Sequence, residues 1–126
     1  MISEEIKIIA LVGLGGALGS IARYLIHGYI GDHDFPWGTF VVNFLGSLLL
    51  SMIFFSSLGA ELDPSVKAFL FVGIFGGFTT MSTFSLDTVG LIIAERFNAA
   101  LFNIFLNGGL CVFGGLVGRW LALSLI

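Results

Sequence analysis

The amino-acid sequence predicts an all-α membrane protein, with four transmembrane helices in a single domain over residues 1–126. Of the 126 residues, 57% are apolar and only 10% are charged, whereas a soluble domain has about 25% charged residues. The mean hydropathy is +1.08, and the apolar residues gather in four long segments. The third segment contains a run rich in glycine and hydroxyl residues, from Gly76 to Ser85, and this run predicts a helix that is broken near its middle.

The four segments have the length that a membrane span requires. A helix needs about 20 residues to cross about 30 Å of hydrocarbon, and we expect spans at about 5–29, 37–58, 66–94 and 98–124. Glu4 and Glu5 stand where a signal peptide has a basic region, so we expect the first segment to be retained. Four spans place both termini on the same side, and we expect a multi-pass protein of a cell membrane.

The basic residues give almost no bias in orientation. The side of the termini has two lysines and an arginine, which are Lys7, Lys67 and Arg119. The opposite side has two arginines, Arg23 and Arg96. The positive-inside rule therefore predicts no firm topology. We expect the chain to insert both ways and to pair with itself as an antiparallel, dual-topology homodimer. The net charge of −3 and the lack of a basic patch argue against a nucleic-acid partner.

Glycine recurs at a spacing of four residues in three spans. These pairs are Gly15–Gly19, Gly73–Gly77 and Gly114–Gly118. Such spacing lets helix backbones approach closely. We interpret the pairs as packing positions in preference to functional ones.

The run from Gly76 to Ser85 predicts an ion site. Glycine is permissive and threonine hydroxyls compete for backbone groups, so we expect Gly76, Gly77 and the threonine-rich stretch after them to unwind the helix. The break would free carbonyls such as those of Gly76 and Thr79. Two antiparallel copies that meet there would be able to enclose one hard cation.

Neutral polar residues form two stripes inside the spans. One stripe is Thr39, Asn43, Ser47 and Ser51, and the other is Asn103, Asn107 and Cys111. Each stripe is compatible with hydrogen bonds between helices. Together with Ser82 and Thr83, the two stripes are better interpreted as the lining of an ion path. Because the lining donates hydrogen bonds and has no carboxylate, it favours a small anion. Phe84 would offer the positive rim of its ring to that anion or pack in the core.

The ionisable residues inside the spans are few. Arg23 has two interpretations, a side chain that reaches the interface or the basic wall of an anion vestibule. For Asp87 we prefer an arginine partner or a helix cap over a proton site. We expect Arg119 to be an interfacial anchor, and His27 and His33 to be surface residues.

At these residues the sequence resembles the Fluc fluoride channel family, also called CrcB. The resemblance covers essentially the whole chain. It rests on three motifs: Gly15-Gly16-x-x-Gly19-x-x-x-Arg23-Tyr24, Pro36-x-Gly38-Thr39-x-x-x-Asn43 and Gly76-Gly77-x-Thr79-Thr80-x-Ser82-Thr83-Phe84-Ser85-x-Asp87. The third motif is long and specific.

The resemblance implies a dual-topology homodimer with two pores that conducts fluoride passively and protects a microbe from it. It also implies a central structural Na⁺ held by the carbonyls of Gly76 and Thr79 from each subunit. It places Asn43, Ser82, Thr83 and Phe84 on the fluoride path. We extend the path to Thr39, Met81, Asn103 and Asn107, with Arg23 at the vestibule.

Three path positions depart from the family pattern. Met81 stands where the family has a second pore phenylalanine, and a thioether has no positive rim. Asn103 and Asn107 stand where the family often has tyrosine and serine. Both still donate hydrogen bonds, so we expect an altered track that still conducts. Asp87 replaces a frequent glutamate.

Other functions fit the sequence less well. A small multidrug-type proton antiporter needs a carboxylate in the first span, and residues 6–30 contain none. A non-conducting accessory subunit would have no use for two polar stripes. Enzyme function has no support, since the chain has no nucleophile–base pair, metal triad or phosphate loop.

Overall fold

The computed structural model describes residues 1–125, and they form a bundle of four membrane-length helical segments. The first two segments are α1 (Ile2–Ile30) and α2 (Trp37–Phe54). The third is composite and contains α4 (Pro64–Lys67), η1 (Ala68–Phe75), α5 (Gly76–Phe78) and α6 (Met81–Ile93). The fourth contains α7 (Phe97–Ile104), η2 (Phe105–Leu110) and α8 (Cys111–Leu125). A short helix, α3 (Ser57–Glu61), lies in the connection after α2.

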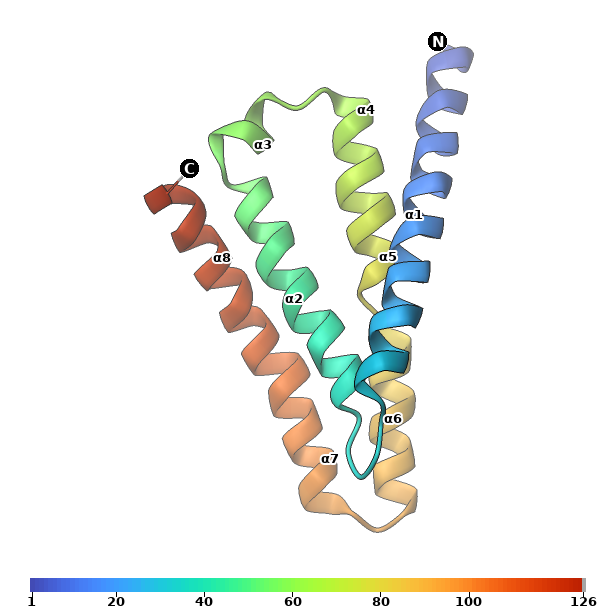
Figure 1. The fold of residues 1–126 in the computed structure, drawn as a ribbon, viewed down its shortest axis with the longest axis vertical. Helices are drawn as coiled ribbons and strands as arrows, with labels where there is room; N and C mark the ends of the chain where they lie inside the picture. The colour runs from blue at the N-terminus through green and yellow to red at the C-terminus, as the bar shows by residue number, and fades with distance from the viewer. Residues whose placement is uncertain (126) are drawn as a thin grey trace.

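The predicted spans agree with these segments except at their ends. The second span ends at Phe54, four residues earlier than expected, because Ser56 caps α3 there by accepting a hydrogen bond from the backbone of Gly59. Figure 1 shows that successive segments run in opposite directions and that both termini lie at one end, as predicted. The segments lie close together near α6 and α7 and diverge toward the termini.

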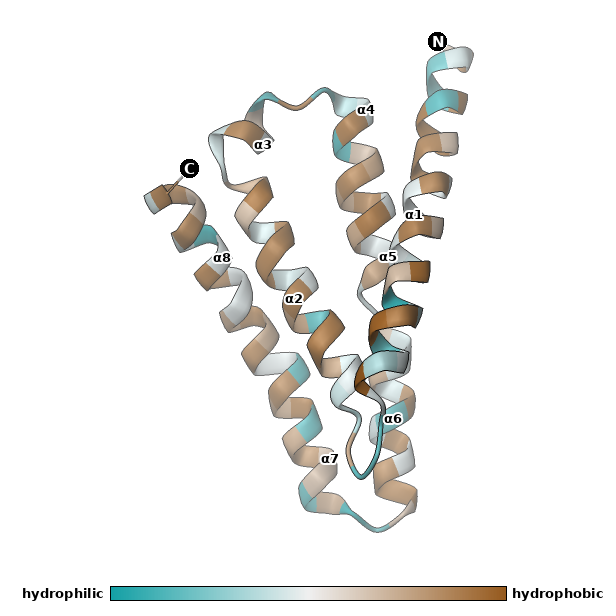
Figure 2. Ribbon diagram, viewed as in Figure 1, coloured by the Kyte–Doolittle hydropathy of each residue, from teal (hydrophilic) through white to brown (hydrophobic). Residues whose placement is uncertain are grey.

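The outer surface of the bundle is apolar. Figure 2 shows hydrophobic residues along all four segments, with hydrophilic ones at the connections and in a few interior turns. Most large apolar side chains of α1 and α8 are exposed, including Ile9, Leu25 and Leu116. This pattern suits a protein whose solvent is lipid.

The predicted glycine pairs lie at helix contacts. A Cβ atom added to Gly15 would collide with the carbonyl oxygen of Phe69, and one added to Gly19 with that of Ile74. A Cβ atom on Gly77 would lie 2.6 Å from the carbonyl oxygen of Gly16. The glycines therefore let α1 pack backbone to backbone on η1 and α5, and Gly118 does the same for α8 on α2.

The third segment is broken as predicted, but the break follows the glycines. Gly76 and Gly77 are helical, and the extended residues are Thr79 (φ −86°, ψ 157°) and Thr80 (φ −149°, ψ 111°). The expectation of unwinding is therefore confirmed for the threonine-rich stretch and wrong for Gly76 and Gly77. These residues stay helical because Gly77 is packed against α1, while the hydroxyl of Thr80 caps the new helix by accepting from the backbone N–H of Thr83.

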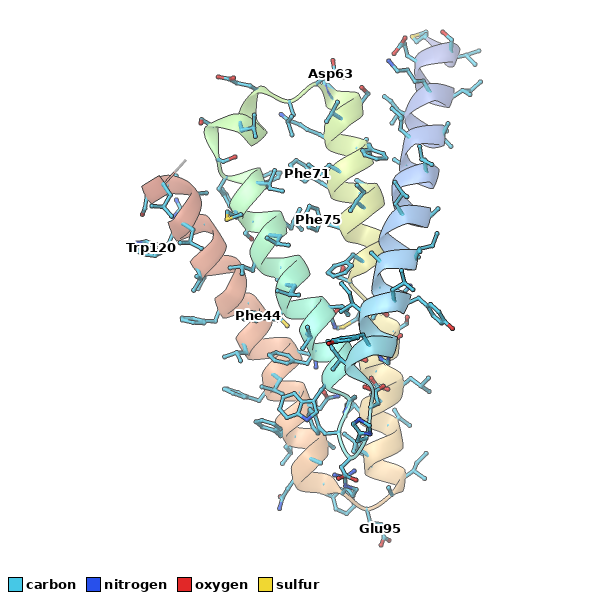
Figure 3. The ribbon with its side chains drawn as sticks, viewed as in Figure 1. Phe44, Asp63, Phe71, Phe75, Glu95 and Trp120 are labelled. Carbon is cyan, nitrogen blue, oxygen red and sulfur yellow. The ribbon has the colours of Figure 1, made fainter. Side chains whose placement is uncertain are left out.

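Two π-helical stretches, η1 and η2, were not expected from the sequence. Both continue an α-helix without a break in the chain, and a wider turn of this kind shifts the face on which later side chains lie. In Figure 3, Phe71 and Phe75 of η1 project toward α2. The ring of Phe71 lies 5.3 Å from that of Phe54, measured between centroids. Aromatic packing therefore fills part of the space between α2 and the third segment.

Charged residues mark the two ends of the bundle, as Asp63 and Glu95 show in Figure 3. Asp63 caps α4 by accepting hydrogen bonds from the backbone N–H of Ser65 (2.9 Å) and from its hydroxyl (2.6 Å). These bonds lower the pKa of the Asp63 carboxyl below its ordinary value. Arg119 lies over the ring of Phe55 at 5.5 Å, which agrees with an interfacial anchor.

Candidate functional site

The break in the third segment is bridged by one side chain from α2. The amide oxygen of Asn43 accepts from the backbone N–H of Thr80 at 2.7 Å, and its amide nitrogen donates to the backbone carbonyl of Thr80 at 3.1 Å. A broken helix leaves backbone groups without helical partners, and lipid supplies none. Asn43 therefore satisfies both backbone groups of Thr80.

Polar contacts continue from Asn43 to the fourth segment. Its amide nitrogen also donates to the side-chain oxygen of Asn107 at 2.9 Å. Asn107 in turn donates to the side-chain oxygen of Asn103 at 3.0 Å and to its backbone carbonyl at 3.1 Å. Asn103, which is 0% exposed, donates to the hydroxyl of Thr88 at 3.0 Å. The predicted polar residues of the second and fourth spans are thus joined.

A hollow of about 240 Å³, here called the Asn43 groove, lies beside this network. Its lining residues are Asn43, Ser47, Leu50, Thr79, Thr80, Met81, Phe84, Asn107 and Cys111. No carboxylate is among these lining residues. Its wall includes the first turn of α6, and the N-terminal end of a helix carries a partial positive charge. The groove therefore combines neutral hydrogen-bonding groups with a potential that favours an anion.

A second hollow, the Arg23 groove, lies on another side of the break. It has a volume of about 460 Å³ and is lined by Arg23, Tyr24, Leu25, His27, Gly28, Thr80 and Thr83. The Nε atom of Arg23 donates to the backbone carbonyl of Gly77 at 3.0 Å. Arg23 thus lies against the broken segment, and its charge borders an open hollow.

The structure distributes the predicted path residues over these two grooves. Asn43, Met81, Phe84 and Asn107 line the first, and Thr83 lines the second with Arg23. Ser82 is exposed, and its hydroxyl lies 3.4 Å from that of Thr80. Asn103 lines neither groove. Their places on an ion path remain predictions.

A separate polar cluster lies beside the middle of α6. Thr39 is 0% exposed, and its hydroxyl donates to a carboxylate oxygen of Asp87 at 2.7 Å. The Nε2 atom of His27 lies 3.3 Å from the Thr39 hydroxyl and 3.1 Å from a carboxylate oxygen of Asp32. His27 is thus part of a half-buried cluster, which corrects the expectation of a plain surface residue. Asp87 binds Thr39 and neither of the partners we preferred for it, an arginine or a helix cap.

Sequence reasoning missed four participants in these contacts. Thr80 and Thr88 link α6 to its neighbours, and His27 and Asp32 surround Thr39. The only signal was for Thr80, which lies in the run where the break was expected, because threonine is a preferred cap where a helix begins again. The other three depend on contacts between distant parts of the chain.

Comparison with known proteins agrees with this arrangement. The family model described as CrcB-like protein, Camphor Resistance (CrcB), matches residues 10–119. The chain belongs to the CrcB family. Its CrcB relatives include the Fluoride-specific ion channel FluC of Shewanella pealeana, 41% identical over 119 residues, which cover 92% of this chain and 96% of the relative. The protein of the same name in Methanococcus aeolicus is 36% identical over 121 residues, covering 95% of this chain and 98% of the relative.

The CrcB assignment confirms the resemblance that the motifs indicated. The relatives are named as ion channels and not as enzymes. The match covers all four spans at least in part, and both grooves lie within it. The grooves are accordingly the places in this CrcB chain where an ion path is to be sought.

Proposed function

We propose that this chain forms a passive, fluoride-selective anion channel that exports fluoride across a cell membrane and lowers its concentration in the cytoplasm. The observation that carries the proposal is the Asn43 groove, a hollow at the N-terminal end of α6 whose polar lining is neutral and includes no carboxylate. The names of the CrcB relatives support fluoride as the ion.

Fluoride suits this lining because it is small and strongly hydrated. A pore that accepts it must replace water with hydrogen-bond donors at short range. Both amide hydrogens of Asn43 already bind Thr80 and Asn107, so an anion at Asn43 competes with these internal acceptors. We propose that only a compact ion with a strong attraction for N–H groups succeeds, which disfavours chloride.

We propose that the working unit is an antiparallel homodimer with two pores. The near balance of basic residues on the two sides supports insertion in both orientations. Met81 is 73% exposed although it lines the Asn43 groove. A second copy against this side would turn each open groove into an enclosed pore, since it would supply the missing wall.

A central structural Na⁺ also fits the residues of the break. Thr80 donates its backbone N–H to Asn43, and Thr83 donates its own to the Thr80 hydroxyl. The carbonyls of Gly76 and Thr79, four residues earlier in each case, are thereby released from the usual helical pattern. A Cβ atom on Gly76 would meet only one atom, at 3.9 Å, so the space beside it is open. Carbonyl oxygens are suitable ligands for a hard cation, and two chains would offer four.

The proposal is tested with purified protein in liposomes loaded with fluoride or chloride. We expect rapid fluoride efflux and almost no chloride efflux from matched vesicles. Fluoride flux should not follow a Na⁺ gradient, because the Na⁺ has a structural role. Comparable chloride efflux would reject selectivity, and flux that scales with the Na⁺ gradient would reject passive conduction.

A proton antiporter of the small multidrug type remains the alternative, and the structure gives it no added support. The first span has no carboxylate between residues 6 and 30. Proton-coupled uptake of an organic cation that depends on Asp87 would favour it.

A further inference from the structure

Five hydrogen bonds form a head-to-tail chain that begins and ends on α6 or its cap. The backbone N–H of Thr80 donates to Asn43 (2.7 Å), Asn43 to Asn107 (2.9 Å) and Asn107 to Asn103 (3.0 Å). Asn103 then donates to Thr88 (3.0 Å), and the Thr88 hydroxyl donates to the backbone carbonyl of Phe84 (2.8 Å). The chain of bonds therefore leaves the start of α6, passes through α2 and the fourth segment, and returns to α6.

The two ends of this chain determine its direction. A backbone N–H can only donate and a backbone carbonyl can only accept, so the bond at Thr80 and the bond at Phe84 must run the same way. Each carboxamide between them has one orientation that satisfies both neighbours. Reversing any single amide would place two donors or two acceptors face to face. Successive bonds of one direction polarise and strengthen one another.

The far side of this chain lies away from the Asn43 groove. Asn103 is 0% exposed and Thr88 is 8% exposed, and neither lines the groove. Met81 and Phe84 do line it, from the first turn of α6. Thr88 lies one turn after Phe84, so both project from nearly the same face of the helix. A bond that holds Thr88 against the fourth segment therefore also sets the direction in which Phe84 projects.

We propose that Thr88 and Asn103 are positioning residues, whose buried hydrogen bond fixes the rotation of α6 and thereby places Phe84 and Met81 at the groove. Because α6 follows an extended break, the helix before the break does not fix its rotation, and side-chain contacts must do so. In this role Asn103 acts from behind the groove and does not line the ion path. The consequence for flux rests on the proposed channel function.

The test uses a pair of variants at Thr88 with a matched control on the same helix. Thr88→Val keeps the shape but removes the hydroxyl, and with it the bonds to Asn103 and to the Phe84 carbonyl. Thr88→Ser keeps the hydroxyl. The control is Ser85→Ala, because the Ser85 hydroxyl also donates to a carbonyl four residues earlier, that of Met81 at 3.0 Å, but is exposed to the outside of the bundle.

Two readouts separate positioning from general stability. The first is the ¹⁹F chemical shift of 4-fluorophenylalanine incorporated at position 84, which reports the surroundings of that ring. The second is fluoride efflux per folded protein, with chloride beside it. For Thr88→Val we expect a displaced or broadened resonance and a fluoride flux lower by about tenfold, the size expected for the loss of two membrane hydrogen bonds. Thr88→Ser and Ser85→Ala should resemble the wild type in both.

The two readouts distinguish failure of the positioning proposal from failure of the proposed channel function. If the wild type carries no fluoride, the channel proposal fails, while the ¹⁹F shift still tests the positioning. An unmoved resonance in Thr88→Val overturns the positioning, and a moved resonance with unchanged flux overturns its consequence for conduction. If Thr88→Val does not fold, Thr88→Ala removes the same hydroxyl without a branched side chain, and the same results decide.

Discussion

Asn43→Asp tests whether the anion path passes the bridge across the break. The aspartate would keep an oxygen for the Thr80 N–H but lose both donated bonds, to the Thr80 carbonyl and to Asn107. Each acceptor left without its donor costs about 1–3 kcal/mol. The substitution also adds a negative charge. At about 4 Å and an effective dielectric constant of about 20, that charge repels a passing anion by about 4 kcal/mol, which slows passage about a thousandfold.

The matched control is Asn43→Leu, which loses at least as many hydrogen bonds and adds no charge. Because flux is normalised to folded protein, a difference in stability between the two variants does not enter the comparison, and any further loss of flux in the aspartate variant reports the charge. The assay is fluoride efflux from liposomes, normalised to the fraction of protein that elutes as a folded species. We expect Asn43→Asp to conduct at least about a hundredfold more slowly than Asn43→Leu. Flux through Asn43→Asp equal to that of the wild type would show that no anion passes near Asn43.

Three further predictions concern packing, a helix cap and the Arg23 groove. Gly19→Ala should destabilise the fold by about 3 kcal/mol or more, because the added Cβ collides with the carbonyl of Ile74. The control is Gly13→Ala, whose Cβ would have nothing within 4 Å and which should be neutral or stabilising in thermal unfolding. Equal losses of stability in the two variants would contradict the backbone contact at Gly19. Ser65→Ala should raise the pKa of Asp63 toward its ordinary 3.8, because it removes the hydrogen bond from the Ser65 hydroxyl. A lowered pKa stabilises the fold above the ordinary pKa, and this stabilisation is lost as pH falls through the folded pKa. The variant should therefore be slightly less stable than the wild type at neutral pH, with the difference disappearing in acid, and an unchanged NMR titration of Asp63 would refute the cap. Arg23→Gln should reduce fluoride flux by about tenfold through loss of the positive charge beside the groove, whereas Arg23→Lys should retain most of it; similar flux in the two variants would leave the charge without a role.

The sequence was sufficient for features that depend on composition and local spacing. The lengths of the apolar segments predicted four spans, and the glycine pairs predicted close contacts such as that of Gly15 with Phe69. The hydroxyl-rich run predicted a broken third helix. The break lies in the threonine-rich part of that run and not at its glycines, because Gly77 packs against α1 within a helical turn.

Features that depend on contacts between segments were not predictable in this way. Asn43, Asn103 and Asn107 were expected to share a lining. Hydrogen bonds join the three side chains, but Asn103 is buried and does not line the Asn43 groove, which no local spacing in the sequence indicated. Thr88 carries no local signal, since its importance arises only where α7 brings Asn103 beside it. For the same reason the sequence predicted His27 as a surface residue. Its contact with Asp32 arises only because the connection after α1 folds back beside it.

Fluoride efflux from proteoliposomes, measured beside a chloride control, tests the central claim most directly. The groove at the break is lined by neutral polar groups and by the N-terminal end of α6, with no carboxylate among its lining residues. We therefore expect fluoride to leave the vesicles rapidly while chloride is retained. Retention of both ions by correctly folded protein, or release of both at similar rates, would contradict it.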